Sequence, residues 1–283
     1  MRSNYYYLYS SLPEIRFEAT QDYSRLSYIF DEVYESLCDE DKLLMLYIRY
    51  PVDNRNMINL LEKNSTDFSP FGNYSERELR QEIVTLDTLP KYMQLFLEMY
   101  REFPVEMSGH GNINRLNPFF YDEVMELGNG LLKQWFLFDR DLKNVLTAIE
   151  CRKHNQTVEK RDIPRIGQKM GQILIGENDI TENLHQSKSL DYSLSGTLPW
   201  IAKVLNFNSI STMDYEKKIL LLQFEMIDQI VGNEIFSVDT ILAFMLKLHI
   251  LMRWSKLDEH AGRKNFDRIM GQTPSLVENI FLF

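Results

Sequence analysis

The sequence is poor in the two residues that most often interrupt helices. Only 12 of its 283 residues are glycine and 9 are proline, whereas an average composition would give about 20 and about 14. A β-sandwich or β-barrel needs many tight turns, and glycine and proline dominate such turns. The composition therefore favours an all-α fold, and a chain of this length can bury a substantial core without a metal or a disulfide framework.

The spacing of apolar residues also predicts helices. Apolar side chains recur at three- and four-residue steps over residues 22–37 and 43–50, and we expect Pro51 to end the second of these helices. Asp53 is a candidate cap for a third helix. Ser75 and Glu78 have the spacing of a capping box, which predicts a helix start at that point.

The rest of the chain follows the same pattern. Pro90 suits the first turn of a helix that reaches about Phe103, and Asn117 with Pro118 predicts another helix start. Further helices are predicted over residues 131–154, 214–231 and 238–257. The exception is the aromatic segment from Tyr5 to Leu12, which ends at Pro13 and predicts a short extended N-terminal segment.

Residues 104–117 carry two glycines and three asparagines and are the clearest internal linker. This linker predicts an N-terminal acidic helical bundle over residues 1–103 and a helical remainder over 118–283, packed together as one compact unit. The first 103 residues hold 18 acidic and 11 basic side chains, and the rest of the chain holds 23 and 20. The acidity is therefore concentrated before the linker, and we expect the two parts to meet different partners.

One weak repeat is present. Residues 11–13, 88–90 and 197–199 each place serine or threonine, leucine and proline in succession. The repeat suggests three similar helical sub-bundles. The alternative is that a hydroxyl residue followed by proline is common chemistry at the start of a helix.

Charge and cysteine content restrict the setting in which the protein works. The net charge of -10 predicts no nucleic-acid binding, because the phosphates would repel the chain. Cys38 and Cys151 are too few for a disulfide framework, and a polar, tyrosine-rich segment rather than a signal peptide follows Met1. We expect a reducing, cytoplasmic location. Apolar runs are too short to span a bilayer, which predicts membrane contact only through partners.

Few residues have a spacing that indicates chemistry. Glu182 and His185 are the only glutamate and histidine with the three-residue spacing used in di-iron bundles, and a second such pair is absent from the sequence. A surface pair is the favoured interpretation. The glycines near Lys169 lack the strand and the Gly-Lys-Ser/Thr ending of a phosphate loop. The sequence therefore predicts no catalytic residue, no cofactor and no metal.

The stretch from Arg140 to Lys169 departs from the general acidity, with eight basic and four acidic side chains. This stretch is a candidate docking surface for an acidic partner or for an anionic membrane face. The alternative is a solvated helix end at which Arg152 and Lys153 complement the helix dipole.

Part of the same stretch carries a resemblance to a known family. Residues 138–153, FDRDLKNVLTAIECRK, resemble a helix of the central-stalk subunit of rotary V/A-type ATPases that is known as C or d. The match is best at Asn144 with Val145 and at Arg152 with Lys153. The start of the chain, from Tyr5 to Glu14, and residues 241–254 also resemble an uncharacterised bacterial family encoded beside such ATPase subunits.

This resemblance implies a non-catalytic, all-helical, funnel-shaped subunit of three similar bundles. Such a subunit sits on the membrane proteolipid ring and receives the rotor axle, so that it couples ATP turnover to ion transport. It implies a cytoplasmic position, peripheral to the inner face of the membrane. The resemblance and the basic stretch together make the following residues candidate interface positions: Arg140, Lys143, Asn144, Arg152 and Lys153. The alternative is a helical enzyme or a small-ligand or metal-binding protein with a site between bundles, near Glu182, His185 and tyrosines.

Overall fold

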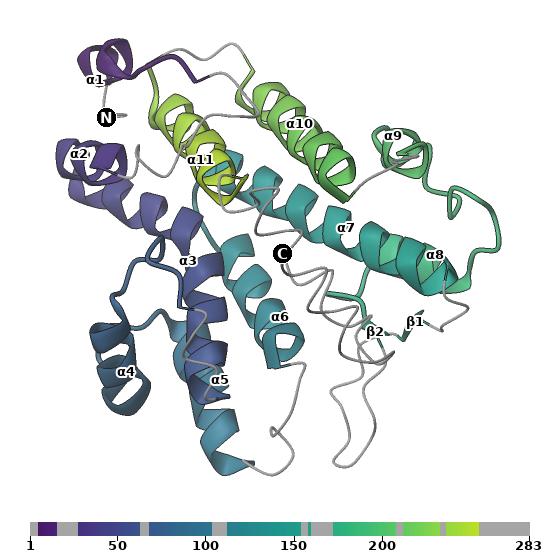
Figure 1. Cartoon of the computed structure of the whole chain (residues 1–283), viewed down its shortest axis with the longest axis horizontal. Coiled ribbons are helices and arrows are strands. Elements are labelled where there is room, and N and C mark those ends of the chain that lie inside the picture. Colours follow the sequence, from purple (N-terminus) through teal and green to yellow (C-terminus); the bar gives the residue numbers. More distant parts are fainter. Residues whose placement is uncertain are drawn as a thin grey trace. The chain divides into compact units, whose positions relative to one another are not determined.

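The computed structural model of the chain describes residues 5–15, 28–62, 68–103, 112–153, 158–159, 172–207, 212–232 and 236–254. These residues form eleven α-helices and one pair of two-residue strands, which confirms the predicted all-α fold class (Figure 1). The chain separates into two compact units, one made of Met1–Cys38 with Asn206–Phe283 and the other of Asp39–Leu205. We call them unit 1 and unit 2.

Unit 2 is built around one central helix. Its described elements are α3 (Asp39–Leu61), α4 (Glu76–Thr85), α5 (Lys91–Glu102), α6 (Asn112–Met125), α7 (Gly130–Lys153), β1 (Val158–Glu159), β2 (Gln172–Ile173), α8 (Asp179–Gln186) and α9 (Ile201–Leu205). The two strands pair in parallel. Helix α6 packs against α3, α5 and α7, and α7 also packs against α8. The core of unit 2 therefore centres on α6.

Four aromatic side chains, one from each of four helices, form a continuous series of ring contacts in this core. Tyr50 of α3 contacts Tyr92 of α5, with ring centroids 6.1 Å apart. Tyr92 contacts Phe120 of α6 at 5.4 Å, and Phe120 contacts Phe136 of α7 at 5.1 Å. All four rings are buried. Each edge-on pair adds roughly 0.5–1.5 kcal/mol beyond the burial of its area, so the series fixes the four helices to one another.

Unit 1 contains helices α1 (Tyr6–Ser11), α2 (Tyr28–Ser36), α10 (Thr212–Val231) and α11 (Val238–Trp254). Helix α10 packs against α11, whose apolar side chains are largely buried. Tyr5 connects the N-terminal segment to the rest of the unit. Its backbone N–H donates to the Phe236 carbonyl at 2.9 Å, and its hydroxyl accepts the Cys38 N–H at 3.2 Å. Among the described residues, no helix combines the length and the apolar character that crossing a bilayer requires.

The predicted helix end at Pro51 is wrong, because α3 continues through this proline to Leu61. Proline inside a helix removes one backbone hydrogen bond and costs about 3 kcal/mol. Ile48 and Met57, on either side of Pro51, are both buried. Burial of such side chains contributes about 1.5–3 kcal/mol each, so the apolar face of α3 outweighs the local cost.

Two other predictions also differ from the structure. Helix α6 begins at Asn112 and contains Pro118 rather than starting beside it. The segment predicted as extended is helical from Tyr6 to Ser11. There the Ser10 hydroxyl donates to the Tyr6 carbonyl at 2.8 Å and the Ser11 hydroxyl to the Leu8 carbonyl at 2.7 Å. Aromatic residues over so short a run fit either structure. Tyr6 and Tyr9, three residues apart and so on one face of a helix, both contact the Phe236 ring, which favours the helix.

The predicted helix start at Ser75 is confirmed. The Ser75 hydroxyl accepts the Glu78 N–H at 3.3 Å, and the Glu78 carboxylate accepts the Ser75 N–H at 2.8 Å. Helices α7 and α10 also begin and end within two residues of the predicted positions. Reciprocal caps and long periodic runs depend on neighbours in sequence, which is why the sequence locates them well.

The compact units do not follow the division predicted at residues 104–117. Residues 104–111 lie outside the described residues, and residues 112–117 belong to α6. Helices α5 and α6, on either side of the predicted linker, pack against each other inside unit 2. The glycine- and asparagine-rich stretch therefore connects two packed helices, while the boundaries between units fall after Cys38 and after Leu205.

Within the described residues, the weak repeat precedes a helix at two of its three positions. Residues 88–90 and 197–199 precede α5 and α9, whereas residues 11–13 lie at the end of α1. An arrangement in three similar sub-bundles stays a prediction.

Removal of the central ring tests the aromatic series. We expect Phe120→Ala to lower the free energy of unfolding of unit 2 by about 3–5 kcal/mol, because a buried ring is lost and a cavity remains. Urea denaturation measures this change. Phe103→Ala is the matched control, since Phe103 is 40% exposed, and a similar loss in both variants would contradict the role of the series.

Candidate functional site

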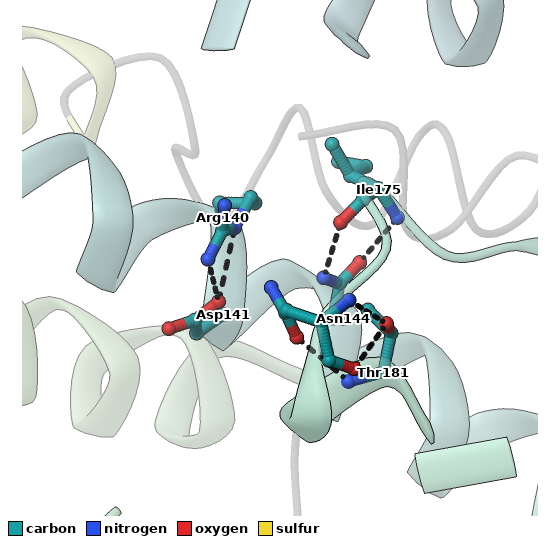
Figure 2. A network of polar contacts seen from close by, with 6 residues as sticks. Arg140, Asp141, Asn144, Ile175 and Thr181 are labelled. Atoms are coloured by element: carbon teal, nitrogen blue, oxygen red, sulfur yellow. Dashed lines mark hydrogen bonds and ion pairs between the residues drawn. The ribbon is translucent and has the colours of Figure 1, made fainter. Parts of the chain in front are cut away.

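The five predicted interface residues all lie on α7, and three of them, Lys143, Asn144 and Arg152, bond to other parts of unit 2. We call α7 together with residues 174–195, to which it is bonded, the α7 junction. Asn144 lies inside it and is 1% exposed. Its side-chain amide donates to the Ile175 carbonyl at 2.9 Å and accepts the Ile175 N–H at 2.7 Å (Figure 2). The Asn144 side chain therefore satisfies both backbone groups of Ile175, which would otherwise be costly to bury.

Arg140 and Asp141 form a second contact of the junction. Arg140 donates from Nε and from a terminal nitrogen to one Asp141 carboxylate oxygen, at 3.1 and 3.0 Å (Figure 2). Both side chains are mostly buried. Burial raises the pKa of Asp141, and the adjacent Arg140 charge opposes this rise. Gly176 lies beside Arg140 with a φ of +81°, a conformation that glycine adopts without strain.

Residues 175–176 lead directly into α8, whose start is fixed by a reciprocal cap. The Asn178 side chain accepts the Thr181 N–H at 2.9 Å, and the Thr181 hydroxyl accepts the Asn178 N–H at 3.0 Å. Figure 2 labels Thr181 and marks the hydrogen bonds of this cap with dashed lines. The usual capping box has glutamate or glutamine at its second position, so threonine in that role gives no signal in the sequence.

Lys143 joins α7 to α6. Its ammonium donates to the Asp139 carboxylate at 2.8 Å and to the Tyr121 hydroxyl at 2.9 Å. The same Tyr121 hydroxyl donates to Asp139 at 2.7 Å. Burial, followed by the Asp139 charge, raises the pKa of Tyr121 well above its ordinary value, so this hydroxyl stays protonated and able to donate.

Arg152 fixes the loop that follows α8. Its guanidinium donates to the carbonyls of Ser187 at 3.1 Å and Ser189 at 2.8 Å. The guanidinium carbon also lies 3.7 Å from the ring centroid of Tyr192, a cation–π contact. Tyr192 and Ser193 both have positive φ values, 56° and 61°. Arg152 therefore stabilises a backbone conformation that these residues rarely adopt alone.

Asp191 organises the interior of the same loop. Its carboxylate accepts the Ser189 hydroxyl at 2.8 Å, the Ser195 hydroxyl at 2.5 Å and the Ser193 N–H at 3.1 Å. These hydrogen bonds, with Ser195 foremost, lower the pKa of Asp191 to about 2. Leu190 projects from the loop and is 86% exposed. The junction thus presents an apolar side chain on an ordered loop.

Lys153, like Arg152, is exposed to solvent. Its side chain is 58% exposed and pairs with Glu150 on the same helix at 2.7 Å. An ion pair of this kind at the surface contributes about 0–1 kcal/mol to stability. The charge of Lys153 can therefore be changed at little cost to the fold.

The described residues contain no set of three or more histidine, cysteine, aspartate or glutamate side chains arranged to hold a metal ion. Glu182 and His185 lie on α8, where the Gln186 amide also donates to Glu182. Cys38 is exposed, whereas Cys151 is buried and its thiol pKa is raised by that burial. A raised pKa keeps the Cys151 thiol protonated and unreactive.

A second anchoring site, which the sequence does not predict, lies on α3. Asp53 is fully buried and accepts the Asn73 N–H at 2.9 Å and the Tyr74 N–H at 3.3 Å. Asn56 exchanges two 2.8 Å hydrogen bonds with the backbone of Ser69. A Cβ added at Gly72 would lie 2.1 Å from an Asp53 oxygen, so the loop approaches α3 too closely for any other residue.

The prediction of Asp53 as a helix cap is wrong, because Asp53 lies in the interior of α3. Aspartate is a poor residue for a helix interior, which is why the sequence favours a cap. The signal that identifies its real role is the cluster of Asp53, Asn54 and Asn56 in a helical stretch. Such residues inside a helix can use their side chains to hold another segment. Burial raises the pKa of Asp53 to about 7, and the N–H donors of Asn73 and Tyr74 oppose a further rise.

Replacement of Asp53 tests the α3 anchor. Asp53→Asn puts an N–H₂ group against backbone N–H donors, and we expect a loss of about 1–3 kcal/mol in the free energy of unfolding. The folded-state pKa lies above the unfolded one, so the stability that Asp53 contributes is complete below about pH 4 and is lost as the pH rises to about 7. The stability difference between wild type and Asp53→Asn should therefore shrink over this range in urea titrations. Asp87→Asn, at an exposed position, is the matched control, and an equal change in both variants would contradict the α3 anchor.

Alanine variants of the neighbouring residues Arg152 and Lys153 test whether Arg152 holds the loop after α8. We expect Arg152→Ala to speed amide hydrogen exchange over residues 187–193 by about tenfold or more, because charged hydrogen bonds and a ring contact are lost. Lys153→Ala should leave these rates unchanged. Equal rates in wild type and Arg152→Ala would show that Arg152 does not hold the loop.

Comparison with known proteins gives a family but no described activity. A family model with the description "Protein of unknown function (DUF2764)" matches residues 2–275. The search of curated proteins and the search of solved structures returned no match. Because the model spans nearly the whole sequence, this chain belongs to the DUF2764 family.

Proposed function

We propose that this protein is a non-catalytic subunit of a V-type rotary ATPase that couples the rotor axle to the membrane proteolipid ring. The observation that carries the proposal is the α7 junction. Residues 138–153, which resemble a helix of the central-stalk subunit of these ATPases, lie within the single helix α7. Asn144 and Arg152, two of the best-matching positions, are the side chains with which α7 holds residues 175 and 187–189.

A coupling subunit has to transmit torque without chemistry of its own, and the construction of unit 2 suits that task. The 24-residue helix α7 is fixed to α6 by a ring contact and by Lys143, and it is fixed to the segments after it by Asn144 and Arg152. Closely packed interiors have low compressibility and pass strain on. In this role the chain needs no cofactor, metal or catalytic residue.

Docking on a proteolipid ring would put the protein at the cytoplasmic face of the membrane, in contact with the bilayer only through its partners. Exposed groups of the α7 junction, such as Lys153 and Leu190, are the parts available to a neighbouring subunit.

Copurification tests the proposal directly. A tagged full-length chain, expressed in its native cells and recovered from gently solubilised membranes, should bring down the axle and proteolipid subunits of the ATPase. Recovery of the tagged chain without any ATPase subunit, at a detergent concentration that preserves the rest of the complex, would refute it.

A charge reversal tests the part played by the junction. We expect Lys153→Glu to reduce the ATPase subunits recovered by severalfold at low salt while the melting temperature of the isolated chain stays unchanged, because a charge at the edge of an interface affects association and not the fold. Lys91→Glu, at an exposed position of α5, is the matched control. Equal recovery with both variants would exclude Lys153 from the interface. Arg152→Glu is unsuitable here, since it also disrupts the loop.

A further inference from the structure

The loop after α8 has a backbone conformation of high energy. Tyr192 and Ser193 have φ values of 56° and 61°, in the left-handed region that residues other than glycine rarely occupy. Two such residues in succession carry a conformational cost that the contacts of the loop must offset. Strain of this kind is often found in parts of proteins that switch between two arrangements.

The Tyr192 side chain adds a second cost. It is 2% exposed, and its hydroxyl has no hydrogen-bond partner among the described residues. A buried hydroxyl without a partner loses its hydrogen bonds to water and gains nothing in exchange. The loop is therefore held closed against both backbone strain and an unsatisfied polar group.

Arg152 holds this conformation from α7. One terminal nitrogen of its guanidinium donates to the Ser189 carbonyl at 2.8 Å, and the other donates to the Ser187 carbonyl at 3.1 Å. The guanidinium carbon lies 3.7 Å from the centroid of the Tyr192 ring. A single exposed side chain thus joins α7 to the loop at three points. We call Arg152 with residues 187–193 the Arg152 latch.

The hydrogen-bond acceptors in the latch are not the ones that a guanidinium binds most strongly. Peptide carbonyls are neutral, whereas a carboxylate is charged and matches the two terminal nitrogens with its two oxygens. The carboxylate of the loop itself, on Asp191, instead accepts the hydroxyls of Ser189 and Ser195. Arg152 therefore holds the latch through neutral groups, and a carboxylate from outside can compete with them.

We propose that the Arg152 latch is a two-state element that opens when a carboxylate of a partner protein binds the Arg152 guanidinium. A ligand shifts a two-state equilibrium only if it binds one state better. In the closed latch both terminal nitrogens donate to the loop, so the open state alone offers the pair to a carboxylate. Opening also releases the backbone strain and lets the Tyr192 hydroxyl reach water. The proposal does not depend on the coupling function.

The charges around the latch favour a short acidic segment as the partner. Lys153 is next to Arg152 on α7, and Lys188 lies between the two serines whose carbonyls accept from Arg152; both lysines are exposed. The pairing of Lys153 with Glu150 offsets part of this positive charge. A broad anionic surface such as a bilayer would also meet the net charge of -10 of the whole chain. A short segment can contact the latch alone.

Hydrogen exchange of the full-length chain tests whether the latch opens by itself. Protection factors over residues 187–193 should be at least about tenfold lower than those of the α6 core at residues 116–124. Equal protection in the two segments would show that the latch opens only when unit 2 unfolds, and would overturn the proposal.

Two glycine variants test the strain. Ser193→Gly removes the cost of the positive φ and should raise the protection of the latch about fivefold or more relative to Ser187→Gly. Ser187 is the matched control, because its φ is -70° and its hydroxyl belongs to the same hydrogen-bonded set as that of Ser193. Equal protection in the two variants would mean that no strain is stored, and would overturn the proposal.

The unsatisfied hydroxyl is tested by Tyr192→Phe, which keeps the ring beneath Arg152. This variant should raise the protection of the latch about threefold or more. Tyr121→Phe is the control and should give no such rise, since the Tyr121 hydroxyl donates to Asp139. Lower protection in Tyr192→Phe than in wild type would show that the hydroxyl stabilises the closed latch, contrary to the proposal.

A short peptide of alternating glutamate and glycine is the probe for the partner. At saturation it should lower the protection of the latch about threefold or more while the α6 core is unchanged, and the same peptide with glutamine should have no effect at matched ionic strength. Equal effects of the two peptides, or no effect of the glutamate peptide, would overturn the proposal.

Two variants and one further ligand locate the response. Arg152→Lys keeps the charge but lacks the paired nitrogens, so the glutamate peptide should cause no further loss of protection. Lys153→Ala should keep most of the response. Equal loss of the response in both variants would reduce it to general charge attraction and overturn the proposal. Opening by phosphatidylglycerol vesicles and not by the glutamate peptide would make a membrane the ligand in place of a partner protein.

Discussion

The contacts of the Phe120 ring with Tyr92 on one side and Phe136 on the other hold the centre of unit 2 together. With Tyr50 at the far end, the ring series joins α3, α5, α6 and α7. Edge-on aromatic pairs restrict both the distance and the orientation of the helices that contribute them. Asp53 and Asn144, which satisfy backbone groups of later segments, project from α3 and α7, two of the helices that the series joins.

The anchors themselves share one design. Asp53, Asn56 and Asn144 project from helices and satisfy backbone groups of loops that follow them in sequence. Arg152 does the same from a helix end. A chain with few glycines and prolines has few tight turns that hold themselves, and polar side chains of neighbouring helices supply the missing hydrogen bonds. The chain therefore combines few turn residues with several polar side chains that project from helices and hold its loops.

Charge is used differently in the two units. In unit 2 the basic side chains of Lys143 and Arg152 at the α7 junction are engaged in holding the fold, and Lys153 stays largely exposed. In unit 1 the carboxylates of Asp31 and Glu32 on α2 are exposed to solvent. Buried or bonded charges chiefly set structure, whereas exposed ones chiefly set which partners approach and how fast. This difference separates the residues that hold the protein together from those available for recognition.

The all-α class, the capping box at Ser75, and the extents of α7 and α10 within two residues follow from the sequence alone, because they depend on composition, short-range hydrogen bonds and periodicity. The sequence also singles out Asn144 and Arg152, although not the segments that they contact. The features that the sequence does not predict depend on packing between residues far apart in the chain. Helix α3 passes through Pro51 because burial on both sides outweighs the lost hydrogen bond.

Asp53 is the clearest example of a residue whose role the sequence alone does not reveal. It acts as a loop anchor because Asn73 and Tyr74, some twenty residues away, come to lie against it. The predicted division at residues 104–117 does not match the compact units because α5 and α6 pack against each other across it. Contacts between residues far apart in sequence leave no periodic signal in a single chain, so only the folded arrangement reveals them.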